Sequence, residues 1–217
     1  MKYKRIYLLI LLLIVPVLAF AASKDTGYLI KNWKYEATAH EDNTWEVTET
    51  MVVTFTQQRH GIFRYIPRRF SRQIETADGQ QKLQYRTLLR DVTVDQHKYD
   101  LSDADDDQDN LVIKIGDKNK FANTLETYTI SYTLCYPDDR ITGADFITHT
   151  VLGTECNTDI QDFSFDIRFD KPLPAGLNLK IYSGSWGNRN NDLEIMASTT
   201  SDHISGTLSE GPAFKGL

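Results

Sequence analysis

The sequence predicts an all-β protein, an antiparallel β-sandwich of two sheets that is immunoglobulin-like in general architecture. After the first 30 residues or so, apolar side chains recur at every second position in short runs, which is the period of a strand with one buried face. No stretch of ten or more residues carries the apolar stripe of a helix. Because each such sheet has an apolar face to bury, a second sheet must cover the first.

The first two strands are the clearest. Apolar residues alternate with polar ones over residues 33–39, and the alternation resumes over residues 45–55 after the turn-forming Glu41–Asn43. These two runs predict a β-hairpin. Further strands are expected at residues 92–94, 111–115, 128–134, 163–169, 177–181 and 193–195.

Residues 1–21 have the features of a secretory signal peptide. Three basic residues precede the apolar stretch Ile6–Phe20, and the small side chains of Ala19 and Ala21 suit a signal peptidase, so we expect cleavage after Ala21. The alternative is a retained anchor helix, which 15 apolar residues interrupted by Pro16 disfavour, since a span needs about 20.

The remainder, residues 22–217, is expected to form one β-sandwich domain on the periplasmic or extracellular face of the cytoplasmic membrane. We expect it to be a fragment of a longer protein that is anchored by segments beyond Leu217. Residues 1–21 hold three of the 24 basic residues and none of the 30 acidic ones, so the remainder has a formal charge of −9. That acidic balance excludes nucleic acid as an expected partner.

Four segments together resemble a known family. They are the strand Val47–Phe55, the segment His60–Pro67, the strand Asp91–Val94 and the strand Tyr128–Tyr132, which occur in this order. The chain resembles the bacterial family of predicted membrane proteins called domain of unknown function 2207. The resemblance implies an extracytoplasmic β-rich domain with transmembrane segments downstream, and it transfers no activity.

Glu49 and Arg64 are candidates for a structural ion pair. Glu49 is in phase with the apolar residues of its strand, so strict alternation points its carboxylate into the core. A buried carboxylate needs a partner, and the guanidinium of Arg64, within an apolar segment, can satisfy both oxygens. The functional alternative is a ligand-binding glutamate or a general acid.

A basic patch is the second candidate. Arg59, Arg68, Arg69 and Arg72 fall within fourteen residues of one another without an intervening acid. Such a patch could bind anionic lipid head groups or an acidic glycan. The alternative is a solvated cluster that protects a sheet edge from strand addition.

Cys135 and Cys156 are the only cysteines and are expected to form a disulfide in an oxidising compartment. Cys135 ends one predicted strand and Cys156 precedes another, so a returning connection of about twenty residues could bring them together. Two free thiols are the alternative, whereas a redox-active pair lacks the short spacing of such motifs.

The remaining candidates are weaker. The acidic run Asp103–Asp109 lacks the glycine and the glutamate of a helix-loop-helix calcium site, which favours an acidic hairpin loop. Trp186, between two glycines, could stack on a sugar but more often such a residue fills a turn. The histidines lack metal-ligand spacing and are expected at surfaces or in turns, so neither a metal nor a cofactor is expected; they are His40, His60, His97, His149 and His203.

These features lead to one expected function and one alternative. We expect a non-enzymatic interaction domain of a membrane-associated bacterial protein, with an envelope or membrane protein as partner. The alternative is a carbohydrate-binding or carbohydrate-processing module that uses the Trp186 loop or the acidic run.

Overall fold

The computed structural model describes residues 26–76, 79–103, 110–138, 148–173, 180–184 and 196–211. The predicted signal peptide, Trp186 and all of the acidic run but Asp103 lie outside these residues, as do most of the predicted strand at 177–181 and the whole of that at 193–195. The described part is all-β, as predicted. Its strands are β1 Tyr28–Ala39, β2 Thr44–Phe55, β3 Gly61–Pro67, β4 Arg69–Thr76, β5 Gly79–Arg86, β6 Leu88–Val94, β7 Tyr99–Asp103, β8 Asn110–Gly116, β9 Leu125–Cys135, β10 Ile160–Phe169, β11 Met196–Thr199 and β12 His203–Gly211.

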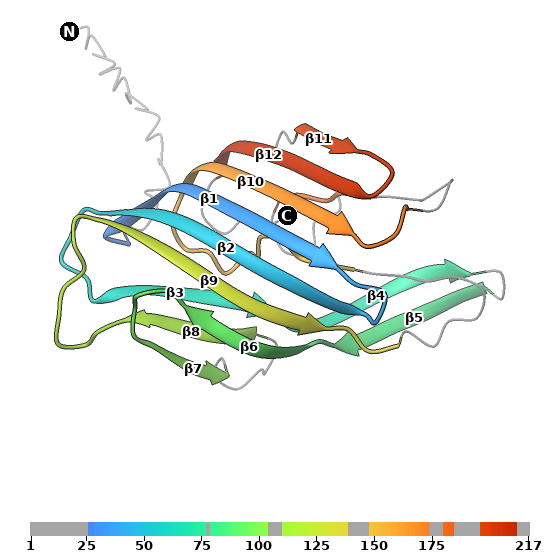
Figure 1. Ribbon diagram of the computed structural model, residues 1–217, viewed down its shortest axis with the longest axis horizontal. Helices are drawn as coiled ribbons and strands as arrows, with labels where there is room; N and C mark the ends of the chain where they lie inside the picture. Colours follow the sequence, from blue (N-terminus) through green and yellow to red (C-terminus); the bar gives the residue numbers. More distant parts are fainter. Residues whose placement is uncertain are drawn as a thin grey trace, which may run out of the picture.

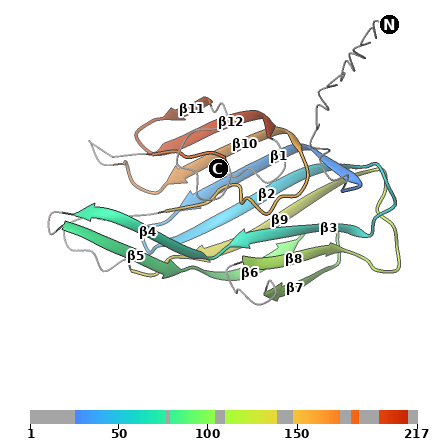
Figure 2. The ribbon, with the colours of Figure 1, turned by 180° about the vertical axis from the view of Figure 1, so that it is seen from behind.

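Seven strands form one large sheet in the order β11-β12-β10-β1-β2-β9-β6 (Figure 1). A smaller sheet, β3-β8-β7, lies below the β2 and β9 side of the large sheet, and β4 and β5 form a hairpin that projects at one end (Figure 2). In the described part, no helix has the length and apolar character that crossing a bilayer requires.

The predicted β-hairpin is confirmed as β1 and β2, with Trp33 opposite Met51 and Ala39 opposite Trp45. The prediction of purely antiparallel sheets is wrong at one place, because β1 pairs with β10 in parallel, with Ile30 opposite Ile160. Strand β9 runs in the same direction as β1, since each is antiparallel to β2. The chain therefore has to travel back along the length of the sheet between β9 and β10.

The large and small sheets share one apolar core. Alternate residues of β1, β2, β9 and β10 point to the same face of the large sheet, and residues such as Ile62 and Ile113 of the small sheet meet them. The returning segment between β9 and β10 completes the cover, with Leu152 only 1% exposed. The small sheet and this segment therefore pack against part of the inner face of the large sheet.

The predicted Cys135–Cys156 disulfide is wrong, because both thiols are free. Cys135 lies opposite Thr44 at one end of the large sheet. Cys156 donates a hydrogen bond to the carbonyl of Thr158 (3.4 Å). The Thr158 hydroxyl in turn donates to the carbonyl of Tyr28, which lies at the other end of the large sheet. About ten strand residues separate these ends, or roughly 30 Å, whereas a disulfide requires Cα atoms within ~7 Å.

We predict that Cys135 reacts with a maleimide faster than Cys156 does. Burial raises the pKa of the Cys156 thiol, and the thiolate is the reactive form. The rates should be compared in the variants Cys135→Ser and Cys156→Ser, each with one remaining thiol. A titration of the unreduced, denatured chain that finds no free thiol would contradict the structure.

Candidate functional site

The most buried carboxylate of the described part, Glu49, lies at the centre of the inner face of the large sheet and is 0% exposed. Its neighbours across the strands are Tyr35 on β1 and Ile130 on β9. The register places Trp33 and Tyr132 two residues away on the adjacent strands, within reach of a side chain on the same face. The indole Nε1 of Trp33 donates to Oε2 of Glu49 (2.9 Å) and the Tyr132 hydroxyl donates to Oε1 (2.5 Å).

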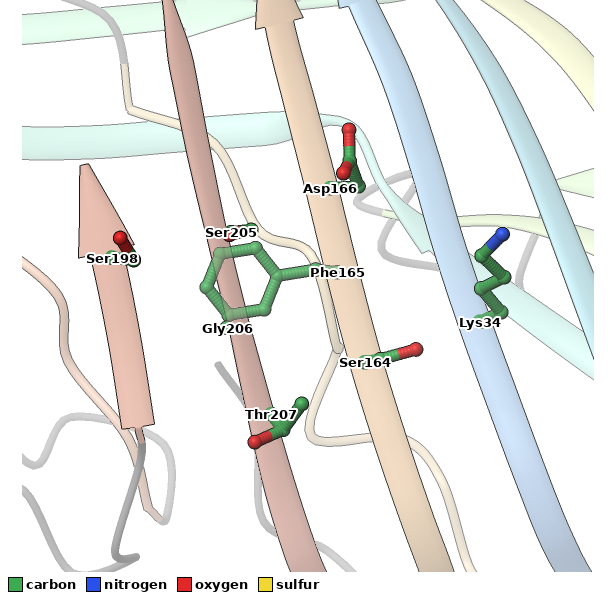
Figure 3. A pocket seen from close by; sticks show the side chains of 8 residues that line it. All are labelled: Lys34, Ser164, Phe165, Asp166, Ser198, Ser205, Gly206 and Thr207. Carbon is green, nitrogen blue, oxygen red and sulfur yellow. The ribbon is translucent and has the colours of Figure 1, made fainter. Parts of the chain in front are cut away.

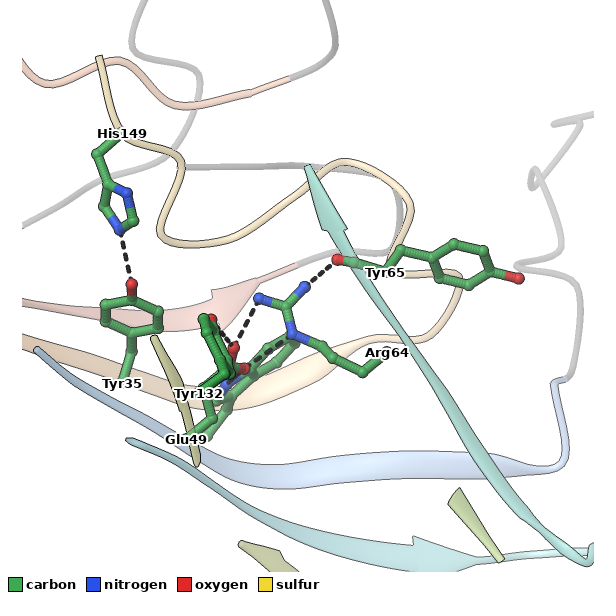
Figure 4. A network of polar contacts seen from close by, with 7 residues as sticks. Tyr35, Glu49, Arg64, Tyr65, Tyr132 and His149 are labelled. Atoms are coloured by element: carbon green, nitrogen blue, oxygen red, sulfur yellow. Dashed lines mark hydrogen bonds and ion pairs between the residues drawn. The ribbon is translucent and has the colours of Figure 1, made fainter. Parts of the chain in front are cut away.

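Arg64 approaches the same carboxylate from β3 of the small sheet (Figure 4). Its Nε donates to Oε2 of Glu49 (2.8 Å) and its Nη2 donates to Oε1 (2.9 Å), which is a bidentate pair. The guanidinium carbon lies 4.8 Å from the ring centroid of Trp33, and Nη1 donates to the carbonyl of Tyr65. The predicted Glu49–Arg64 ion pair is confirmed.

This network is satisfied internally. Glu49 accepts four hydrogen bonds, so its lone pairs have no capacity left for a substrate proton. Burial disfavours the charge on Arg64, but the Glu49 carboxylate more than compensates and raises the pKa of the guanidinium above its usual range. The arrangement supports the structural interpretation of the pair over the ligand-binding or general-acid alternative.

A second polar cluster surrounds His149, in the segment that returns from β9 to β10. The Tyr35 hydroxyl lies 2.7 Å from Nε2 of His149, and the Tyr136 hydroxyl is bonded to Nδ1. The indole of Trp45 packs against the imidazole with ring centroids 4.5 Å apart. Burial, and then the nearby charge of Arg64, lower the pKa of His149 to about 3, so the ring is neutral near pH 7.

The prediction of a surface or turn position holds only in part for His149, which lies in a loop with intermediate exposure but packs against Tyr35, Tyr136 and Trp45. Its partners come from three places that are distant in the sequence, so no local spacing could have indicated the cluster. Other histidines are nearer to the prediction, since His40 and His203 lie at the ends of strands and contact Asp170 and Asp166 (each 2.8 Å). Among the residues that the structure describes, no three His, Cys, Asp or Glu side chains are grouped as a metal site would require.

The outer face of the large sheet carries a shallow hollow of about 340 Å³ across β1, β10, β12 and β11 (Figure 3). Its rim carries one cation, Lys34, and one carboxylate, Asp166, and Gly206 lies between them and β11. Lys34 pairs with Glu36 (2.7 Å), and Asp166 pairs with Arg168 (3.2 Å). The other lining residues are Ser164, Phe165, Ser198, Ser205 and Thr207. We call this feature the outer hollow.

The predicted basic patch is not one surface. Arg59 precedes β3 and Arg68 follows it, so about nine extended residues, roughly 30 Å, lie between them. Arg69 lies opposite Arg86 at the start of the β4–β5 hairpin, and the Arg68 guanidinium is directed to the carbonyl of Asn110 (3.5 Å). Arg72 lies opposite Leu83 in the same hairpin.

The fold and these sites define a class of protein: an all-β domain with a sealed ion pair between its layers and an open polar face on its large sheet. The chain belongs to the family described as "Predicted membrane protein (DUF2207) N-terminal domain", which matches residues 29–210. This finding confirms the resemblance and supports membrane association. No curated protein matches the chain.

One solved structure with some similarity is leukotriene A4 hydrolase from Saccharomyces cerevisiae. Its sequence identity is 7% and the TM-score is 0.43, and the match covers 90% of this chain and 29% of the hydrolase. Another is an M1 zinc metallopeptidase from Deinococcus radiodurans, with 8% identity and a TM-score of 0.41 over 88% of this chain and 41% of the other. The chain thus spans less than half the length of each. At these values the likeness bears on neither activity nor ligand.

We predict that Glu49 and Arg64 are strongly coupled in stability. Removing one partner leaves a buried charge without compensation, so Glu49→Gln or Arg64→Met should each lower the free energy of unfolding by about 3–5 kcal/mol. The double variant should lose less than the sum of the two. Chemical denaturation of the four proteins measures the coupling energy.

The exposed pair Lys171–Glu41 (2.6 Å) is a suitable comparison. Its coupling should lie within about 0–1 kcal/mol because solvent screens both charges. Additive effects of Glu49→Gln and Arg64→Met would show that the two side chains do not interact in solution.

We predict that His149 makes stability depend on pH between about 3 and 6.5. Its folded-state pKa of about 3 lies below the ordinary value of 6.5, so the unfolded chain binds the extra proton in this window. The stabilisation is complete above pH 6.5 and is lost progressively as the pH falls toward 3. Between pH 6.5 and 3, the free energy of unfolding should fall more steeply with falling pH in the wild type than in His149→Gln. Equal pH dependence in both proteins would argue against a buried neutral imidazole.

Proposed function

We propose that the chain is a non-enzymatic interaction domain on the periplasmic or extracellular face of the cytoplasmic membrane. Its partner is an envelope or membrane protein, and its contact surface is the outer face of the seven-stranded sheet. Membership of a family of predicted membrane proteins supports the membrane setting. The packed large and small layers further support describing the domain as an uneven β-sandwich.

The observation that carries the proposal is the character of this outer face. Short hydroxyl side chains form rows on β2 and β9, with Thr48 opposite Ser131 and Thr50 opposite Thr129, whereas β1 carries the ion pair Lys34–Glu36. Strands β10 and β12 continue the pattern with Ser164 opposite Thr207. Exposed sheet faces commonly carry long charged side chains, whose immobilisation at an interface costs more entropy than that of serine or threonine. The hydroxyl rows of this face are therefore well suited to a hydrogen-bonded protein contact.

A non-enzymatic role is supported by how the buried titratable groups are used. Glu49 has all its acceptor capacity occupied, and both ring nitrogens of His149 are bonded to tyrosine hydroxyls. General acid–base catalysis needs a titratable group that reaches a substrate proton. The hydrogen bonds of Glu49 and His149 go to protein groups instead.

The carbohydrate alternative has one feature in its favour. The outer hollow combines hydroxyl groups with Lys34 and Asp166, which can hydrogen-bond to a sugar. Sugar sites usually add an exposed aromatic ring for stacking, and the aromatic side chain that lines this hollow, Phe165, is only 5% exposed. The hollow therefore favours a polar protein contact.

We predict that a photo-crosslinker in place of Thr207 captures a discrete envelope protein in intact cells. Thr207 is exposed and lines the outer hollow. The crosslink should disappear when Ser205→Arg fills the hollow, because a long cation at that point prevents close contact. Mass spectrometry of the crosslinked band identifies the partner.

The matched control is a crosslinker in place of Lys82, an exposed residue of the β4–β5 hairpin. Capture from both positions, or from neither, would contradict the proposal. Calorimetric binding of an envelope glycan that Ser205→Arg abolishes would favour the carbohydrate alternative.

A further inference from the structure

We infer that the end of the domain at which β1 begins rests on a bilayer surface that contains anionic lipids. The contact is a rim formed by the loop between β8 and β9 and the first residue of β9. It consists of Lys118, Lys120, Phe121 and Leu125, and we call it the basic-apolar rim. The inference rests on the membrane setting of the proposed function and adds a surface that the proposal does not use.

The rim lies at the end of the domain where the first strand, β1, begins and the last strand, β12, finishes. Leu125 is opposite Thr54, and Tyr28 is opposite Phe55, so the rim is at the start of β1 (Figure 1). The last strand also finishes here, because Gly211 is opposite Ile160, which in turn is opposite Ile30. A membrane segment attached before residue 26 or after residue 211 would therefore hold this end toward the bilayer.

The rim exposes two large apolar side chains. Phe121 is 48% exposed and Leu125 is 57% exposed, whereas most large apolar residues of the described part are buried. Single exposed apolar residues are common on soluble proteins. Two of them beside lysines at one end of a domain have the composition of a surface that inserts shallowly between lipid head groups.

The loop holds Phe121 outward on a stiff support. The His60 ring stacks on Phe121 with centroids 4.6 Å apart. Nδ1 of His60 lies 3.2 Å from the carbonyl of Asp117 and 3.1 Å from that of Lys120, so it carries the proton and donates to both. The amide of Ala122 donates to the carbonyl of Arg59 (2.8 Å). A preordered loop loses little conformational entropy on binding.

The charges of the rim select an anionic surface. Lys118 and Lys120 are exposed and form no ion pair within the part of the chain that the structure describes. The nearby acids are engaged, since Asp117 pairs with Lys98 (2.6 Å) and Glu126 contacts His97 (3.6 Å). Residues 22–217 as a whole are strongly acidic, so two lysines without an ion pair in the described part, at the end where β1 begins and β12 finishes, are a local exception. Anionic head groups attract such lysines.

The test places an environment-sensitive fluorophore in the rim of the full chain. Cys135→Ser and Cys156→Ser remove the native thiols, and Asn119→Cys supplies the labelling site. The chain is mixed with vesicles of phosphatidylcholine with or without phosphatidylglycerol. We expect a blue shift and quenching by lipids spin-labelled at the head group, both stronger in the anionic vesicles. The same label at Gln81→Cys, in the projecting hairpin, should show neither.

Charge variants separate a specific contact from simple tethering. Neutralising one lysine near an anionic surface weakens binding about fivefold, so Lys118→Gln with Lys120→Gln should weaken it roughly 25-fold. The matched pair Lys82→Gln with Lys180→Gln, which removes the same charge from other exposed positions, should leave it unchanged. Circular dichroism should show that both double variants stay folded.

Three results would overturn the inference. The first is a rim fluorophore that stays exposed on anionic vesicles, and the second is equal contact with and without the two lysines. The third is a blue shift that grows with protein concentration in the absence of lipid, which would assign the rim to contact between copies. None of these affects capture of a partner through Thr207, so the failure of the rim and of the proposed function can be told apart.

Discussion

The ion pair between Glu49 and Arg64 is the interaction on which the arrangement of the two layers depends. It joins β2 at the centre of the large sheet to β3 of the small sheet, with Glu49 0% and Arg64 4% exposed. Neither charge has access to solvent, so neither can be stable there unless the other is in place. The small sheet therefore cannot shift or detach without leaving a carboxylate in the core, which couples the position of β3 to that of the whole seven-stranded sheet.

Local pattern predicted much of this correctly. The two-residue period identified the β1–β2 hairpin, and the phase of Glu49 within it indicated a buried carboxylate before any partner was known. Arg64 followed from chemistry, because a guanidinium in an apolar segment is the partner that satisfies both oxygens. These predictions succeeded because each depends on residues within one strand or on the needs of one buried group.

The wrong prediction of a disulfide and the unexpected surroundings of His149 share one cause, which is the parallel pairing of β1 with β10. A strand period does not show direction, so an antiparallel return after Cys135 was the simpler expectation. The actual return runs back along the sheet and carries Cys156 to the far end, which separates the thiols. The same crossing places His149 over Tyr35 and Trp45, a cluster that no spacing in the sequence could indicate. The arginines lie apart for a different reason, since β3 extends between Arg59 and Arg68.

A well-packed apolar pair at positions 49 and 64 could be as stable as the ion pair, so stability alone does not account for it. The geometry offers another reason. A slip of β2 by two residues would keep its apolar face inward but would carry Glu49 away from Arg64. The indole of Trp33 and the hydroxyl of Tyr132 would then lose the acceptor that now receives their hydrogen bonds. Apolar side chains tolerate such slips more easily, since one packs almost as well as another. The buried charge therefore specifies one register among β1, β2 and β9, and this register aligns the hydroxyl rows of the outer face.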